Sequence, residues 1–551
     1  MSEDLLLDVM SRYTQLKETR QKFHPSWREA QEFADSSVIS FEDIGEVPKV
    51  PNRYSSKPSN YLSTLVSGLV GYSVSPNIVW FKLSLQDEEL LDRYKVKDWL
   101  EDSERVMLSE FNRSNLYSQA PLQVRDAAVI GTGVLLIDED LASGRLRFTK
   151  LPANEVYLDI NEYGEVDTVF RDYYMTLRNA VSFFGLENLN EKWQTAYEDV
   201  ERWNDRLEII QAVFPRDGRD TRYKDAKNKP WAAVYVDLSC KEIIKESGYD
   251  ENPFAVFQWD PYPGYAYGTS PAQNALVDIK GLNIAKKTSW QIAQTSAEPP
   301  MKVSEDIRKI DITPRGKTYV SDASQIVEPI QTGQNYPITL QVLEDMKTDI
   351  KDWFFVDFFL MLQQKTAQMT ATEVMELQGE KAATLSNLIV NLNGSLQKII
   401  ERSFNLLYRQ GKIPPVPDSI CGMGAQMKVD FVGPLSQAQR KYHTMGGTMQ
   451  ALQAAGPIMQ MFPNAGDYID GDQLMKTAME GQGLPQNIIR EESDVRAIRE
   501  QRAQAQAQAQ AQAAQMQQQQ NVLQNMDKLG RAAEQGSVMD MLNKQLAGRT
   551  E

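Results

Sequence analysis

The residues with the clearest capacity for chemistry are three consecutive acids, Asp138-Glu139-Asp140. Neighbouring carboxylates supply the oxygen ligands that Mg²⁺ and Ca²⁺ prefer, and such a cluster would suit a metal-dependent nuclease. The same acids precede a predicted turn at Ser143-Gly144, where solvated carboxylates are common, and this second interpretation is favoured. His24 and His443 are the only histidines, so a metal site would depend mainly on carboxylates.

Other patterns that mark catalysis or nucleotide binding are missing from the sequence. Neither Gly-x-x-x-x-Gly-Lys-Ser/Thr nor Gly-x-Gly-x-x-Gly occurs, and no Ser or Cys has a His at a recognised motif spacing. Gly131-Thr132-Gly133 could approach a phosphate, but glycine after a predicted helix more commonly ends that helix. Cys240 and Cys421 are far apart and predict neither a disulfide framework nor a zinc site. We therefore expect no cofactor, no metal and no enzymatic activity.

Five cations gather in one short segment of an otherwise acidic chain. The formal net charge of −16 argues against a protein that binds nucleic-acid phosphates tightly. The segment's cations have two open interpretations, a solvated surface or a docking face for an acidic partner or a phosphate. They are Lys302, Arg308, Lys309, Arg315 and Lys317.

At 551 residues the chain is too long for one core, and two to four substructures are expected. No window holds eighteen consecutive apolar residues, and the acidic start, Met1-Ser2-Glu3-Asp4, does not resemble a signal peptide. These features predict a soluble protein, made in a cytoplasm, with no membrane partner.

Two long helices are the elements around which the chain is organised. Ser270-Pro271-Ala272-Gln273 combines a capping residue, a proline at the first helical position and a capping-box glutamine. The helix runs to Ala297, roughly 40 Å at 1.5 Å per residue. A second helix of similar reach is predicted from Pro337 to Leu362. Its apolar stripe consists of Leu343, Met346, Ile350 and Trp353/Phe354.

The segment between these helices, Met301 to Ile330, alternates at Ile310/Ile312 and Tyr319/Val320 and predicts a small β-containing unit. Two matched helices with an insert at their far ends form a rigid hairpin. Because each helix has only a narrow apolar stripe, the hairpin requires neighbours.

The remaining segments predict an α+β protein that is mainly helical. Helices and antiparallel strand hairpins alternate through the first 265 residues. The Gln-rich loop 363–369 precedes a capping box, Thr370-Ala371-Thr372-Glu373, that opens a helix to about Arg409. Residues 436–490 have helical patterns. The strict Ala/Gln alternation at 503–513 fits either a helix inside an assembly or a disordered tail, because Ala and Gln favour helix over strand.

Several stretches, in their order and spacing, resemble the head-to-tail connecting (portal) proteins of short-tailed, T7-like bacteriophages, over roughly residues 5 to 450. The stretches are Ser59-Asn60-Tyr61-Leu62 with Leu65-Val66-Ser67-Gly68-Leu69, Asp126-Ala127-Ala128-Val129-Ile130-Gly131-Thr132-Gly133, Tyr267-Gly268-Thr269-Ser270-Pro271, Thr370-Ala371-Thr372-Glu373-Val374 and Gly433-Pro434-Leu435-Ser436-Gln437-Ala438-Gln439-Arg440. The Ala/Gln tail contains no matching motif.

The resemblance implies a portal fold and divides the chain accordingly. The expected parts are an α+β wing (1–265), a first stem helix (266–298), a clip (299–335), a second stem helix (336–362), a tunnel loop (363–369), a returning wing helix (370–432), a crown (433–490) and a C-terminal helical tail or barrel (491–551).

The resemblance also implies a function. Such proteins form a ring, usually of twelve subunits, at one capsid vertex of the virion, and double-stranded DNA passes through it without sequence specificity. The expected partners are the terminase large subunit, tail adaptor proteins, and the major capsid and scaffolding proteins. The clip cations Lys302, Arg308, Lys309, Arg315 and Lys317 would face the motor or tail. The residues expected to face DNA are Gln363, Gln364, Lys365, Thr366, Ala367, Gln368 and Met369.

Two alternatives remain open from the sequence. One is a tail adaptor or scaffold-like ring that does not dock a motor. The other is the metal-dependent nuclease that would use Asp138-Glu139-Asp140.

Overall fold

The computed structural model divides the chain into two units, Met1–Pro457 and Ile458–Glu551. In the first unit it describes residues 2–35, 40–41, 53–91, 95–140, 143–216, 218–220, 222–223, 225–297, 301–303, 327–329, 336–363, 385–423 and 426–433. In the second unit it describes residues 498–502, 504–508, 512 and 516, all of which are helical.

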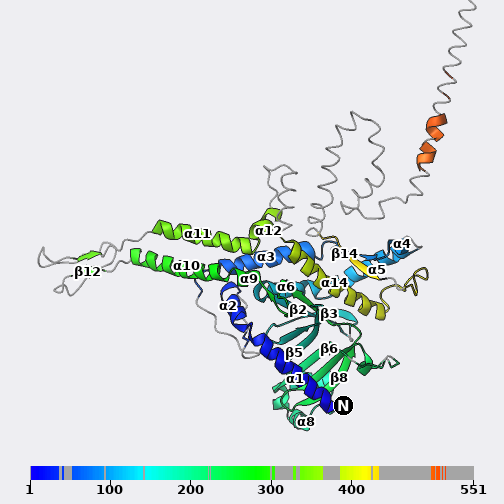
Figure 1. The fold of residues 1–551 in the computed structure, drawn as a ribbon, viewed down its shortest axis with the longest axis horizontal. Coiled ribbons are helices and arrows are strands. Elements are labelled where there is room, and N and C mark those ends of the chain that lie inside the picture. Colours follow the sequence, from blue (N-terminus) through cyan, green and yellow to red (C-terminus); the bar gives the residue numbers. More distant parts are fainter. Residues whose placement is uncertain are drawn as a thin grey trace, which may run out of the picture. The chain divides into compact units, whose positions relative to one another are not determined.

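A five-stranded antiparallel sheet forms one end of the first unit (Figure 1). Its strands follow one another in sequence order, so each pairs with the next strand of the chain. They are β4 (Val156–Ile160), β5 (Val166–Thr176), β6 (Arg206–Pro215), β7 (Trp231–Asp237) and β8 (Glu242–Tyr249). Short helical segments fill the long connection between β5 and β6. They are α7 (Leu177–Phe184), α8 (Glu191–Tyr197) and the 3-10 turns Leu186–Asn188 and Val200–Asn204.

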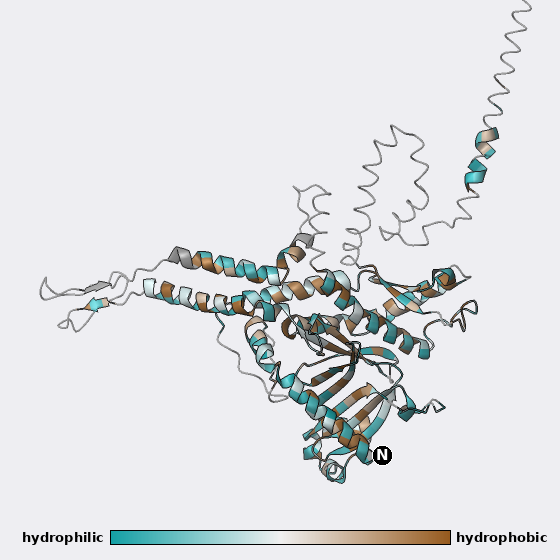
Figure 2. Ribbon diagram, viewed as in Figure 1, coloured by the Kyte–Doolittle hydropathy of each residue, from teal (hydrophilic) through white to brown (hydrophobic). Residues whose placement is uncertain are grey.

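The N-terminal helix α1 (Ser2–Gln21) lies along this sheet and has a small apolar cluster of its own. Val9, Tyr13 and Leu16 are buried there against strand residues that include Phe170 and Phe214. The alternation of strand residues sends the other side chains of the sheet into the large core of the unit. The sheet is thus buried on both faces, and Figure 2 shows hydrophobic residues in its strands.

A second sheet of three antiparallel strands lies next to the first and has the order β3-β2-β9. It consists of β3 (Arg145–Leu151), β2 (Thr132–Asp140) and β9 (Phe254–Gln258). Helices α6 (Leu116–Ile130) and α14 (Ser386–Arg409) pack on it, as does the core around Trp80, Phe81 and Phe111. The remaining elements of this region are α2 (His24–Ala34), α3 (Lys57–Ser73), α4 (Glu88–Leu91) and α5 (Val96–Arg113).

One strand pair joins distant parts of the sequence. β1 (Phe81–Leu85) pairs antiparallel with β14 (Met427–Phe431), with Phe81 opposite Phe431 and Leu85 opposite Met427. No local pattern predicted either strand, and β8 was also absent from the sequence prediction. The helix of the expected returning segment 370–432 ends at Arg409, as predicted, and the chain then goes on to β14.

Two long helices project from the first unit side by side (Figure 1). The small strands β10 (Asp260–Pro261) and β11 (Gly268–Thr269) and the turn α9 (Pro271–Asn274) lead into α10 (Leu276–Ala297). At the far end, β12 (Met301–Val303) pairs with β13 (Val327–Pro329). The chain returns through α11 (Tyr336–Trp353) and α12 (Val356–Gln363). We call α10, α11 and this strand pair the hairpin, and the described residues 2–261 and 385–433 the body.

The structure confirms most predicted elements, among them the helical pattern from Leu177 to Trp203, which forms four short helical segments, and it corrects three. The amphipathic pattern of residues 88–112 predicts one helix, but the structure has two, α4 and α5, with Lys95 in the left-handed region at φ 63°. The helix predicted from Ser270 to Ala297 is divided at Ala275 into α9 and α10. The helix predicted from Pro337 to Leu362 breaks between Trp353 and Val356. The expected crown lies outside the described residues apart from Gly433, and no described helix has the length and apolarity to cross a membrane.

Candidate functional site

The start of the hairpin is fixed by a serine cap and a glycine turn. The Ser270 hydroxyl accepts the Gln273 N–H at 3.0 Å, as the sequence predicted, and donates to the Val129 carbonyl at 2.7 Å. Gly131 ends α6 at φ 88°, and a Cβ there would lie 1.9 Å from the Gly268 carbonyl oxygen. Gly131 therefore works as a helix end that admits a close backbone neighbour, and not as a phosphate loop.

The two hairpin helices pack through a narrow apolar seam. Leu343, Ile350 and Phe354 of the predicted stripe are buried, together with Ile279 and Leu282 of α10. A Cβ at Gly281 would lie 3.2 Å from the Met346 side chain, so the helices approach closely at that point. One member of the stripe was placed wrongly, because Trp353 is 43% exposed.

The outer surface of the hairpin carries large hydrophobic side chains. On α10, Val277 is 80% exposed, Ile284 is 64% exposed and Trp290 is 55% exposed. On α11, Leu340 and Val342 are 44% and 40% exposed. Figure 2 shows brown residues along both helices, away from the sheets. Solvent-facing apolar groups in this number mark a contact surface for another molecule.

A break directs the chain from α11 towards the predicted channel loop. Phe355 lies at the break with φ 51°, a strained value for a bulky residue. The break lets α12 pack on α3, where a Cβ at Gly68 would lie 2.3 Å from the Phe359 ring. Phe359 also stacks on Tyr72, with ring centroids 6.4 Å apart. Tertiary packing onto Gly68 thus overrides the helical pattern of the sequence.

The structure describes only the first residue of the predicted channel loop. Gln363 is the last residue of α12. The other six, Gln364, Lys365, Thr366, Ala367, Gln368 and Met369, lie outside the described residues.

Of the five predicted docking cations, the structure describes one. Lys302 is exposed in β12, and its backbone partner across the strand pair is Glu328. Arg308, Lys309, Arg315 and Lys317 lie outside the described residues, as do Ile310/Ile312 and Tyr319/Val320. The described strand pair is in keeping with a β-containing tip.

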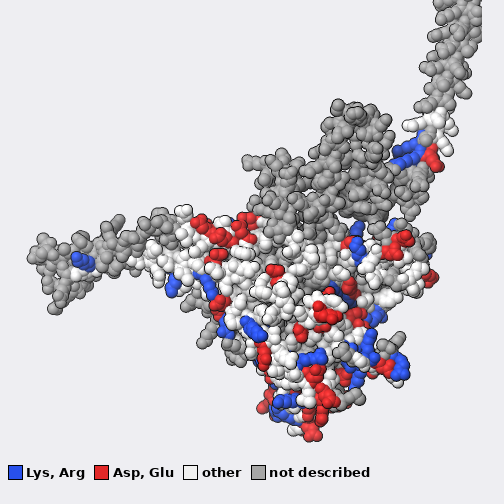
Figure 3. Space-filling model, viewed as in Figure 1, with Lys and Arg blue, Asp and Glu red and all other residues white. Residues whose placement is uncertain are grey.

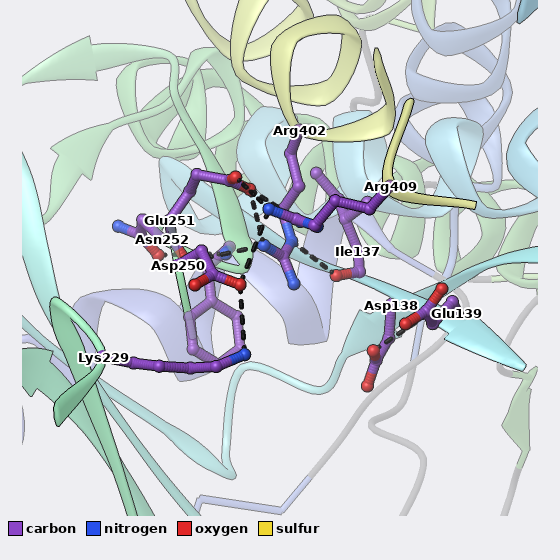
Figure 4. A network of polar contacts seen from close by, with 10 residues as sticks. Ile137, Asp138, Glu139, Lys229, Asp250, Glu251, Asn252, Arg402 and Arg409 are labelled. Carbon is purple, nitrogen blue, oxygen red and sulfur yellow. Dashed lines mark hydrogen bonds and ion pairs between the residues drawn. The ribbon is translucent and has the colours of Figure 1, made fainter. Parts of the chain in front are cut away.

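Helix α14 is anchored in the body by a buried guanidinium (Figure 4). The Arg402 side chain is 4% exposed. Its Nε donates to the Ile137 carbonyl at 2.9 Å, and its Nη1 donates to Glu251 at 3.0 Å. It also lies 5.3 Å from the centre of the Tyr249 ring. Burial lowers the pKa of Arg402, and the carboxylates of Glu251 and Asp138 oppose that shift.

The network continues outward to the surface. Arg409 Nη1 lies 2.7 Å from Glu251 and 3.6 Å from Asp250, and the Lys229 ammonium lies 3.1 Å from Asp250. The segment between β8 and β9 is therefore tied to α14 and to β2 at once. The sequence prediction missed Arg402. Its signal was a charged residue within the buried helical spacing of Ile399, Ser403 and Leu406.

The three consecutive acids do not converge on a metal site. The Asp138 carboxylate accepts the Glu139 N–H at 2.9 Å, and burial raises its pKa. Glu139 accepts a hydrogen bond from Gln410 at 2.6 Å, and Asp140 accepts one from Ser143 at 2.8 Å. Among the described residues, no group of three or more His, Cys, Asp or Glu side chains could hold a metal ion. This geometry gives the nuclease alternative no support.

Comparison with known proteins places these features in a family. A family model described as "Bacteriophage head to tail connecting protein" matches residues 7–489. The portal protein of Salmonella phage epsilon15 is 29% identical over 513 residues, which cover 90% of each chain. The probable portal protein of Bordetella phage BPP-1 is 28% identical over 510 residues, again 90% of each chain. The family match includes the body from residue 7 onward and the whole hairpin.

Proposed function

The chain belongs to the bacteriophage head to tail connecting protein family, and we propose that it is the portal of a bacteriophage capsid. In this role, copies of the chain close into a ring at one vertex of the virion. Double-stranded DNA enters the capsid through the ring during packaging and leaves through it during ejection. The ring also joins the head to the tail, and by analogy with its family it contains twelve subunits.

The observation that carries this proposal is the extent of the family match, residues 7–489, which includes all described elements of the first unit except the first residues of α1. The exposed apolar residues of the hairpin support it. A head-to-tail contact that repeats around an axis gives each hairpin two neighbours. The side chains of Val277, Ile284 and Trp290 would therefore be buried from water only when the ring forms.

An acidic protein is suited to a channel through which DNA has to move. With a formal net charge of −16, the subunit repels the phosphate backbone and avoids the salt-dependent affinity of basic DNA-binding proteins. The Gln-rich loop 363–369 would follow α12 and provide mainly uncharged contacts. Lys365 is its single cation.

The partners follow from the same proposal. The sequence contains no nucleotide-binding motif, so a separate ATPase, the terminase large subunit, would supply the work of packaging. The tip of the hairpin would contact this motor and later the tail adaptors, while the body would contact capsid and scaffolding proteins.

Electron microscopy of the purified chain tests the ring directly. End-on views should show a closed ring with a central channel, and native mass spectrometry should give the subunit number. A chain that stays a single subunit under every assembly condition would rule the proposal out.

The channel loop has its own test. Replacing residues 363–369 by a short Gly linker should leave the ring intact and impair DNA packaging or retention in phage particles. As a matched control, the exposed wing turn Glu162-Tyr163-Gly164 would be replaced by glycines. Normal packaging with the loop variant would remove the loop from the mechanism.

Motor docking separates a portal from a tail adaptor. Lys302→Glu with Arg315→Glu should weaken binding to the terminase large subunit. Arg178→Glu with Arg206→Glu, two exposed cations of the body, should not. Equal binding by both variants would favour an adaptor or a docking site elsewhere.

A further inference from the structure

Three acids form one exposed side of α11, which we call the acidic edge. Asp345, Asp349 and Asp352 follow one another at spacings of four and three residues and therefore share a face of the helix. All three are exposed, and no ion pair within the described part of the chain involves them. Figure 3 shows the resulting red group on α11. Like charges at these spacings repel, so the isolated subunit gains nothing from them.

The opposite charge is found on α10. From Ile279 to Ala297 this helix contains Lys280, Lys286 and Lys287 and no acid. Lys280 and Lys287 are seven residues apart and share the side of α10 that faces away from the buried Leu282, and we call these two lysines the basic edge. Lys286 follows Leu282 by four residues, lies on the packed side and is half-buried. Lys280 pairs with Glu29 at 2.7 Å, and the Lys287 ammonium lies 5.6 Å from the centre of the Tyr54 ring. No ion pair of the described residues involves Lys287.

The two edges cannot neutralise each other inside one chain. The acidic edge lies across α11 from the buried Leu343 and Ile350, and Lys287 lies across α10 from the buried Leu282 and Ser289. Figure 3 shows red on the α11 border of the hairpin and blue on the α10 border. A hairpin with opposite charges on opposite borders is complementary to a second hairpin placed beside it in the same orientation.

We propose that the acidic edge of α11 pairs with the basic edge of α10 in the next copy of this chain. This inference rests on the proposed ring, and it assigns the contact and its direction. Val277, Ile284, Trp290, Val342 and Trp353 lie on the same two helices and supply the apolar part of the contact. The charges select a head-to-tail arrangement, because a two-fold contact would place acid against acid or lysine against lysine.

Charge reversal of one edge at a time tests the pairing. The acid variant is Asp345→Lys with Asp349→Lys, and the lysine variant is Lys280→Glu with Lys287→Glu. Each should retain the circular dichroism and melting temperature of the unmodified subunit, because the substituted side chains point away from the packed seam and the one ion pair that is lost, Lys280 with Glu29, is solvent-exposed. Each alone should lower the association constant at least tenfold, measured by analytical ultracentrifugation at low salt.

Two combinations should restore assembly. A chain with all four substitutions has exchanged edges, so it should form homomeric rings of any subunit number. An equimolar mixture of the two single-edge variants should also assemble, because each supplies the edge that the other lacks. The mixed ring alternates the two chains and therefore closes only if the subunit number is even, which native mass spectrometry reads directly.

The control is a charge reversal of equal size elsewhere, Glu187→Lys with Glu198→Lys on the exposed surface of the body, which should leave assembly unchanged. The inference is overturned if either single-edge variant assembles normally. Normal assembly of the acid variant with a change only in DNA retention would mean that the acids line the channel, and this result would also overturn the inference. It is also overturned if the four-substitution chain fails to assemble. Failure of the unmodified chain to form rings would instead count against the proposed function.

Discussion

The side chains of the body and those of the hairpin differ in where they find their contacts. In the body, the buried Arg402 has a carbonyl and a carboxylate as partners, and the buried Tyr13 hydroxyl donates to Asp172 at 2.6 Å. In the hairpin, one side of each helix is packed, while Ile284 and Trp290 remain more than half exposed. These buried groups of the body thus find their partners within one chain, whereas the outer side of the hairpin calls for a neighbour.

This difference separates two kinds of residue in the same protein. Substitutions in the body should reduce the free energy of unfolding of the subunit, and substitutions on the hairpin surface should reduce association. The predictions below run from the largest expected change in subunit stability to the smallest.

Removal of the buried guanidinium should have the largest effect. Arg402→Met removes the guanidinium partner of the Ile137 carbonyl and leaves Glu251 with Arg409 alone, so we expect a loss of about 3–5 kcal/mol in the free energy of unfolding, measured by urea denaturation of the unassembled subunit. The matched control is Arg409→Met in the same network. Its side chain is 40% exposed, and it should cost less than about 1 kcal/mol. Equal losses of unfolding free energy in Arg402→Met and Arg409→Met would mean that burial of the side chain does not determine how much it stabilises the subunit.

The junction between body and hairpin should show an intermediate effect. Gly68→Ala places a methyl group against the Phe359 ring, so α12 has to shift, at a cost of about 1–3 kcal/mol. Gly71→Ala in the same helix has open space around its Cβ and should instead be stabilising by about 0.5–1 kcal/mol. Hydrogen exchange of α12 should speed up only in Gly68→Ala. Unchanged exchange in that variant would mean that α12 does not depend on this contact.

A buried carboxyl in the body should make stability depend on pH. Burial raises the pKa of Glu104 from 4.5 to about 7, while the Leu83 N–H donates to it at 2.6 Å. Because the folded state binds the proton more tightly, its stabilisation is complete below pH 4.5 and is lost as the pH rises through about 7.

We expect a loss of about 1–2 kcal/mol over that range, after allowance for partial exposure of the carboxyl group. Glu104→Gln keeps the acceptor for Leu83 and should flatten this part of the pH profile in urea denaturation experiments. An identical slope in both proteins would show that Glu104 does not titrate in this range.

Substitutions on the hairpin surface should weaken association of the subunits and leave the stability of each subunit nearly unchanged. Ile284→Ser and Trp290→Ser should each change subunit stability by less than about 0.5 kcal/mol, because more than half of each residue is already exposed to water. Each should nevertheless weaken ring association about tenfold or more, as measured by sedimentation, because buried aromatic and aliphatic anchors dominate interfaces. Tyr163 in the body is 81% exposed, and Tyr163→Ser should change neither subunit stability nor ring association. A large loss of subunit stability in Trp290→Ser would contradict the comparison.

Local signals predicted the elements that positioned the hairpin. Ser270 and Pro271 predicted the start of α9, which leads into α10, and alternation identified most strands of the body. Long-range packing accounts for the errors. The break at Phe355 depends on the space at Gly68, and Trp353 faces outward because the chain turns there. Arg402 was missed because its partners, Ile137 and Glu251, are distant in the sequence.

The pairing of β1 with β14 has a consequence for the synthesis of this protein. Phe81 leaves the ribosome long before Phe431, its partner strand residue. At roughly 5–20 residues per second, β1 waits on the order of tens of seconds with an unpaired edge. A nascent chain therefore has a vulnerable period in which premature contact between copies would pair the wrong edges, and recruitment into a multimer is safest after translation of the C-terminal third has closed that edge.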